Sequence, residues 1–167
     1  MIIRPATAGD LTAITTIYGH HVLKGTGTFE EIPPTEADMA DRMAEVQGCG
    51  LPWFAAEGED GRFLGYAYAG MFRSRTAYRF SVEDSVYVAP EAQGQGVGRL
   101  LLSSVIAACE AAGYRQMLAL IGDSENAGSV ALHKSLGFAP VGVFSDVGFK
   151  AGRWLDVVMM QKRLGAA

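Results

Sequence analysis

The segment from residue 89 to 102, APEAQGQGVGRLLL, constrains the fold more than any other part of the chain. It places glycines at 94, 96 and 98 between a strand that ends near Pro90 and an apolar helix. Glycine adopts backbone conformations closed to other residues and lets a ligand approach the main chain. Because the first amides of a helix lack partners and lie at the positive end of its dipole, this loop predicts an anion site.

Two better known glycine patterns do not match this loop. A P-loop ends in Gly-Lys-Ser/Thr, whereas Gly98 is followed by Arg99 and Leu100. A dinucleotide-binding fingerprint would need its third glycine at position 99. A turn that merely permits tight packing of strand against helix remains the alternative to a phosphate site.

Length and composition predict one globular domain covering residues 1–167. Hydrophobic residues make up 49% of the chain and the net charge is -4, so nucleic acid is not an expected partner. The chain has no uninterrupted run of about 18 apolar residues, and we expect a cytoplasmic protein that does not enter the membrane. Cys49 and Cys109 do not have metal-ligand spacing, so no metal site is expected.

Hydrophobic periodicity and turn residues predict an α/β protein, with Asp10 capping the first helix and Gly113 ending the third. Helices are expected at about 11–23, 36–46, 99–112 and 129–136. In the strand at 81–88, Glu83 and Asp84 point to opposite faces. The other strands are expected at 2–3, 53–57, 63–69, 116–121, 141–144 and 154–162.

Two motifs together resemble the GNAT superfamily of acetyl-CoA-dependent N-acetyltransferases. Gln93, Gly96 and Gly98 match its pattern Gln/Arg-x-x-Gly-x-Gly, and Asn126 and Ser129 precede a helix that ends in Leu-Gly-Phe at 136–138. The resemblance implies an α/β (α+β) GNAT fold. Its mixed, mostly antiparallel sheet has about seven strands, splayed between the fourth and fifth, with about four helices.

The same resemblance implies where acetyl-CoA, the cosubstrate, binds. Its diphosphate would lie on the glycine loop, and its pantetheine arm would pair with the exposed edge of the fourth strand. The candidate cosubstrate-binding residues are Val86, Tyr87, Val88, Gln93, Gly94, Gln95, Gly96, Val97, Gly98, Arg99, Asn126 and Ser129.

Over nearly its full length the chain also resembles the branch that acetylates phosphinothricin, methionine sulfoximine or methionine sulfone. The resemblance is marked in GTFEEIPPT, in VEDSVYVAP at 82–90 and in GFKAGRWLDVVMMQKRL at 148–164. It implies transfer to the α-amino group of a small amino acid analogue and, from the superfamily, a homodimer. Arginines suit the carboxylate and oxygen-rich head of such a substrate. The candidate substrate-binding residues are Phe29, Arg73, Arg75, Tyr78 and Lys150.

The resemblance assigns the chemistry to two side chains. Glu83 would take the proton from the amine, especially if burial raises its pKa. The amide of Val88 would donate to the oxyanion, and His133 would protonate the leaving thiolate. His133 could equally be a helix residue satisfied by a backbone carbonyl, and the arginines could belong to a solvated loop. Lys150, Trp154 and Asp156 either line the site or serve packing and surface charge.

Three other functions remain open at this stage. The enzyme could acetylate another amine, such as a polyamine, an aminoglycoside or a protein N-terminus. The chain could hold acetyl-CoA without turning it over. His20 and His21 could also activate a cysteine nucleophile, although Cys109 falls on an apolar helix face and Cys49 lies between glycines.

Overall fold

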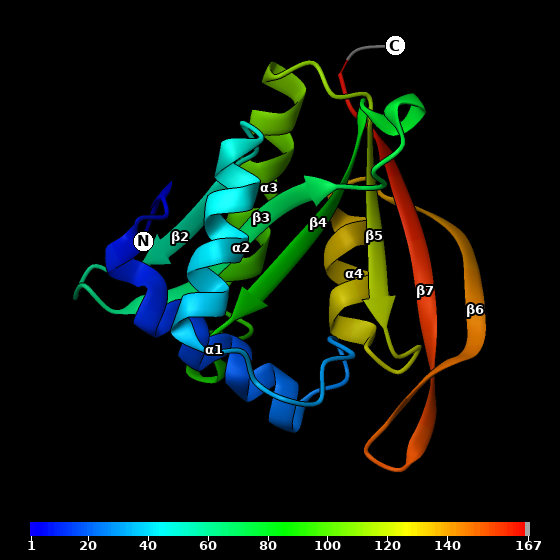
Figure 1. The fold of residues 1–167 in the computed structure, drawn as a ribbon, viewed down its shortest axis with the longest axis horizontal. Helices are drawn as coiled ribbons and strands as arrows, with labels where there is room; N and C mark the ends of the chain where they lie inside the picture. The colour runs from blue at the N-terminus through cyan, green and yellow to red at the C-terminus, as the bar shows by residue number, and fades with distance from the viewer. Residues whose placement is uncertain (166–167) are drawn as a thin grey trace.

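The computed structural model describes residues 1–165. They form one seven-stranded mixed sheet with helices on both faces (Figure 1). The strands lie in the order β1-β2-β3-β4-β5-β7-β6, and only β4 and β5 run parallel. They are β1 (Ile2–Pro5), β2 (Trp53–Glu57), β3 (Phe63–Met71), β4 (Ser81–Val88), β5 (Gln116–Gly122), β6 (Ala139–Lys150) and β7 (Arg153–Arg163). The expected sheet is confirmed.

Four α-helices form in the described part of the chain, as expected. Helix α3 packs on one face of the β1 to β4 half of the sheet and buries Leu101, Leu102 and Val105 completely. Helices α1 and α2 contact β2, β3 and β4 on the other face (Figure 1). The helices are α1 (Leu11–Lys24), α2 (Glu36–Gly48), α3 (Val97–Ala111) and α4 (Ala127–Ser135), with short 3₁₀ turns η1 (Ala8–Asp10), η2 (Thr76–Tyr78) and η3 (Pro90–Ala92).

The sheet splits between β4 and β5, where the resemblance to the GNAT superfamily implies it. The two strands pair only through Ser81–Glu83 and Gln116–Leu118, although β4 continues to Val88. Alternate residues of a strand direct their backbone groups to opposite edges, and the amide of Ala89 bonds back toward β3. The backbone groups of Val86 and Val88 therefore face the open gap.

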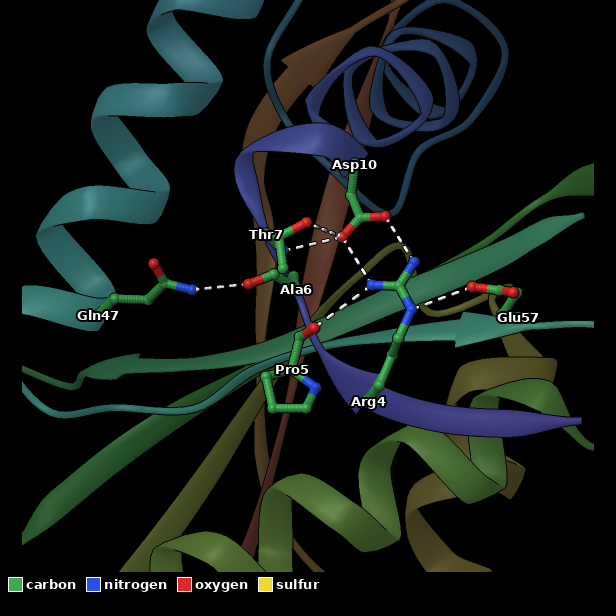
Figure 2. A network of polar contacts seen from close by, with 7 residues as sticks. All are labelled: Arg4, Pro5, Ala6, Thr7, Asp10, Gln47 and Glu57. Carbon is green, nitrogen blue, oxygen red and sulfur yellow. Dashed lines mark hydrogen bonds and ion pairs between the residues drawn. The ribbon is translucent and has the colours of Figure 1, made fainter. Parts of the chain in front are cut away.

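The side chain of Asp10 does not cap α1, and the sequence-based expectation was wrong here. Both of its carboxylate oxygens accept hydrogen bonds from Arg4, each 2.8 Å long, and the amide of Thr7 donates to it as well (Figure 2). The guanidinium of Arg4 lowers the pKa of Asp10. The Asp10 carboxylate therefore forms an ion pair with Arg4 of β1 and does not accept a hydrogen bond from the first amides of α1.

The final hairpin is longer than the periodicity predicts. β6 covers twelve residues and β7 eleven, with irregular register near Pro140 and between Phe144 and Gly148. These bulges interrupt the alternation of side chains, which hides a long strand from a pattern search. In residues 1–165 no helix combines the length and apolarity needed to cross a membrane.

Candidate functional site

A cleft of about 750 Å³ opens at the split between β4 and β5. Strand β4 supplies one wall, α4 supplies another, and the start of α3 lies at one end. Eleven of the twelve candidate cosubstrate residues line it, and Gln95 alone does not, because its amide group donates to the carbonyl of Glu91. The eleven are Val86, Tyr87, Val88, Gln93, Gly94, Gly96, Val97, Gly98, Arg99, Asn126 and Ser129.

The glycine loop forms the expected helix start. Gly94 and Gly96 have φ of 74° and 82°, and Gly96 is the N-cap of α3. This left-handed backbone conformation favours glycine over other residues. The amides at the start of α3 have no partner within the helix, and the loop presents them to the cleft, as an anion site requires.

Glu83 lies where this cleft meets a second one of about 310 Å³. Phe29, Arg73 and Leu120 line the second cleft with it, so two of the five candidate substrate residues are brought together. Burial, and then the charge of Asp84, raise the pKa of Glu83 to about 7, while the charge of Arg73 opposes this rise. A carboxylate with such a pKa can accept a proton near neutral pH.

Asp84 points to the opposite face of β4, as expected, and binds His133 on α4. The Nε2 atom of His133 is 2.8 Å from the Asp84 carboxylate, and Nδ1 is 2.7 Å from the carbonyl of Ser129. His133 is 4% exposed. Since both ring nitrogens have partners, this geometry favours the interpretation in which His133 packs α4 against β4.

Three candidate substrate residues lie outside both clefts in this structure. Arg75 and Tyr78 belong to the exposed segment around η2, where the ring of Tyr78 packs edge-on against Phe72. Lys150 is 5% exposed, and its ammonium donates to the carbonyls of Gly25 and Thr28. None of the three lines either cleft, and a role for them in substrate binding stays a prediction.

Among the residues that line the larger cleft without having been predicted from the sequence are His21, Gly27 and Thr28. His21 donates from Nε2 to the carbonyl of Val88 at 3.0 Å, and burial lowers its pKa. It lies at the open edge of β4 although it comes from α1. The His20-His21 pair in the sequence suggested that these histidines could activate a cysteine. In the structure, His21 instead hydrogen-bonds to the backbone carbonyl of Val88.

Neither cysteine has the surroundings of a nucleophile. Burial raises the pKa of the Cys109 thiol to about 12, and Cys49 is exposed at the end of α2. Neither lines either cleft. A cysteine-dependent mechanism has no support in this geometry.

A cleft at a split between parallel strands, with a glycine-rich helix start at one end, places the chain in a known class. Residues 18–138 match the family model described as the acetyltransferase (GNAT) family, and this protein belongs to that family. It is an acetyltransferase in fold and class.

Individual relatives narrow the comparison. The chain is 54% identical over 164 residues to phosphinothricin N-acetyltransferase of Alcaligenes faecalis, covering 98% of this chain and 83% of that protein. It is 41% identical to L-methionine sulfoximine/L-methionine sulfone acetyltransferase of Salmonella typhimurium, with coverage of 98% and 95%. A phosphinothricin acetyltransferase of Sinorhizobium meliloti, solved in complex with AcCoA, superposes with a TM-score of 0.96 at 51% identity, covering 98% and 88% of the two chains.

The Asp84–His133 pair gives a prediction for NMR titration. Burial by itself lowers the pKa of His133, but the hydrogen bond and charge of Asp84 outweigh it, so the pKa is raised. In Asp84→Asn the histidine stays buried but the neighbouring negative charge is lost. The midpoint of the His133 titration should therefore fall below the usual histidine pKa of about 6.5. Asp10→Asn, on the far side of the fold, is the control and should leave it unchanged. A midpoint that stays high in Asp84→Asn would contradict this account.

Proposed function

We propose that this protein transfers the acetyl group of acetyl-CoA to the α-amino group of a small amino acid analogue of the phosphinothricin, methionine sulfoximine or methionine sulfone type. The observation that carries the proposal is the position of Glu83. It is shared by the larger cleft, which holds the glycine loop, and the smaller cleft, which holds Arg73. A group at that junction can reach both reactants, and the names of the relatives indicate the substrate class.

Acetyl-CoA would occupy the larger cleft. The free amides at the start of α3 would donate to its diphosphate, with Gly94 and Gly96 supplying the required backbone conformation. The pantetheine arm would pair with the open edge of β4 at Val86 and Val88. His21 donates to the Val88 carbonyl, and the Val88 amide has no partner in β5, so it is available to the thioester.

The amine would occupy the smaller cleft. Arg73 provides a cation for the carboxylate or the oxygen-rich head of the substrate. Phe29 and Val157 give apolar walls for the side chain between those groups. Sites for polyamines or aminoglycosides need several acidic groups, and in the described residues this cleft offers Glu83 alone beside an arginine.

The reaction would proceed by direct attack. Glu83 accepts one proton from the substrate ammonium, and the freed nitrogen lone pair attacks the thioester carbonyl carbon. The amide of Val88 donates to the oxyanion of the tetrahedral intermediate. As the intermediate collapses, the C–S bond breaks, and the second proton of the nitrogen ends on the coenzyme thiolate. Glu83 then releases its proton to solvent.

We include a homodimer and a cytoplasmic, detoxifying role in this proposal. The β6–β7 hairpin carries large apolar side chains, among them Trp154, which is 61% exposed, and such a patch is typical of a protein interface. Both cysteines are free, as in most cytoplasmic proteins. The exposed apolar residues of the hairpin are Val141, Val143, Phe144, Val147, Phe149 and Trp154.

A panel of amines tests the substrate class. Release of coenzyme A thiol should be fast with phosphinothricin, methionine sulfoximine and methionine sulfone, because Arg73 matches their oxygen-rich groups. Spermidine, an aminoglycoside and a peptide with a free N-terminal alanine should react far more slowly. Faster acetylation of the peptide or of either polycation than of the three analogues would overturn the substrate assignment, and thiol release with no amine would overturn transfer to an amine.

Glu83→Gln should lower kcat/KM by about a hundredfold or more, which is the usual contribution of a general base. In the wild type, kcat/KM should rise with pH through about 7, as Glu83 loses its proton and becomes able to accept one. The variant should lose this inflection while its Kd for acetyl-CoA stays the same. Glu91→Gln, an exposed carboxylate beside the glycine loop, is the matched control. An unchanged pH profile in Glu83→Gln would remove Glu83 from the mechanism.

Gly96→Val should weaken acetyl-CoA binding, by roughly tenfold or more. A β-branched residue is strongly disfavoured at a φ of 82°, so the helix start must shift and its amides no longer converge. Isothermal titration calorimetry measures the Kd. Gly113→Val changes a glycine with a φ of 84° at the other end of α3 and controls for the loss of stability alone. Equal affinity in the two variants would argue against the glycine cradle.

A further inference from the structure

Residues 25–30, here called the strap, run from the end of α1 across the open end of the split sheet. In Figure 1 this blue segment leaves α1 and passes close to the lower end of α4 before the chain returns to α2. Gly27 lines both clefts, Thr28 lines the larger one and Phe29 the smaller one. The placement of the strap therefore decides the shape of the wall where the two clefts meet.

One set of contacts ties the strap to the helices that cover the β1 to β4 half of the sheet. The hydroxyl of Tyr18 on α1 donates to Glu30 and lies 2.9 Å from the hydroxyl of Thr28. Arg42 on α2 donates to both carboxylate oxygens of Glu30, at 2.7 and 3.2 Å. These contacts hold the C-terminal part of the strap.

A second set ties the strap to the β5-β7-β6 half. The ammonium of Lys150, the last residue of β6, donates to the carbonyls of Gly25 at 2.9 Å and Thr28 at 2.7 Å. Asp123, which follows β5, accepts from the hydroxyl of Thr26 at 2.8 Å. These bonds hold residues 25–28 of the strap, because the bonded carbonyls of Gly25 and Thr28 lie before and after Gly27 in the chain.

Lys150 is unusual for a buried lysine. Among residues 1–165 no carboxylate lies within ion-pair distance of its ammonium, and burial lowers its pKa. Burying a charge costs free energy, so an apolar residue would be expected if packing were the only requirement. The ammonium hydrogen-bonds to two carbonyls of the strap and so fixes their positions. An apolar side chain cannot do this.

The ring of Phe29 shows how closely the strap approaches the same half of the sheet. It lies against Gly122 of β5 and Gly148 of β6, where an added Cβ atom would overlap the ring. Small displacements of the strap backbone would move this ring into or out of the smaller cleft. The hydrogen bonds of Lys150 and Asp123 are therefore placed to control the width of that cleft.

We propose that Lys150 and Asp123 are positioning residues for the amine substrate, which act by holding the strap as the wall between the amine cleft and the acetyl-CoA cleft. They govern the affinity for the amine and its alignment, whereas the glycine loop governs the affinity for acetyl-CoA. This inference rests on the proposed function, because it takes the smaller cleft as the amine site.

Lys150→Met tests the proposal, because it keeps the length of the side chain and removes the donors. The KM for the amine should rise by about tenfold or more, as expected when hydrogen bonds from a charged donor are lost. The Kd for acetyl-CoA should stay within about twofold, and the amides of residues 26–30 should exchange with solvent deuterium faster. Lys162→Met on β7, a partly exposed lysine that lines neither cleft, is the control and should change none of these quantities.

Thr26→Val provides a second variant should Lys150→Met fold poorly. It removes only the hydroxyl that Asp123 accepts from, so the amine KM and the exchange of residues 26–30 should rise in the same direction by a smaller factor. The proposal is overturned if the amine KM stays within twofold in both variants, or if acetyl-CoA affinity falls as much as amine affinity.

The two proposals fail in different ways. If the wild type acetylates another amine from the panel, the KM comparison is made with that amine, and the substrate assignment alone is lost. If no amine reacts, the proposed function fails, and the exchange of residues 26–30 decides whether Lys150 holds the strap. Unchanged exchange in Lys150→Met would overturn the positioning role whatever the substrate proves to be.

Discussion

The open edge of β4 is the feature on which the rest of the site depends. Beyond Glu83 the strand runs to Val88 without a partner in β5, so backbone donors and acceptors at its edge face a cleft. A backbone group without a partner costs about 1–3 kcal/mol once it is buried away from water, so any ligand that covers this edge must hydrogen-bond to its groups. His21 satisfies the carbonyl of Val88, and the remaining groups are available to an extended ligand anchored at the glycine loop.

Strand alternation gives two adjacent carboxylates different surroundings. Glu83 faces the meeting point of the clefts and has a pKa of about 7, whereas Asp84 faces α4 and is bound by His133. The two are nevertheless coupled, because the charge of Asp84 is the second cause of the raised pKa of Glu83 after burial. Asp84, which binds His133 on α4, therefore also contributes to the proton affinity of the proposed base.

The sequence predicts those parts of the structure that depend on near neighbours. The glycine loop, the four helices and the two faces of β4 follow from turn chemistry and periodicity, which act over a few residues. The partners of Asp10 and Lys150 are not indicated by turn chemistry or periodicity. Arg4 of β1 takes the carboxylate of Asp10, and the carbonyls that bind Lys150 are 122 and 125 residues away in the chain. A side chain's type predicts what it can bind, but only the fold determines which partner reaches it.

The proposed amine site depends on both halves of the sheet, because its cleft is lined by Arg73 and Glu83 from one half and by Leu120 and Val157 from the other. The glycine loop continues directly from β4, whereas the Lys150 and Asp123 anchors of the strap belong to the half formed by β5, β7 and β6. The halves are joined by the short pairing of Ser81–Glu83 with Gln116–Leu118, so a change in their angle would displace the far end of β4 most. Glu83 occupies the last paired position. Glu83 lines both clefts and therefore lies where a change in the angle between the two halves would move it least. Such a position suits a group that must contact both reactants.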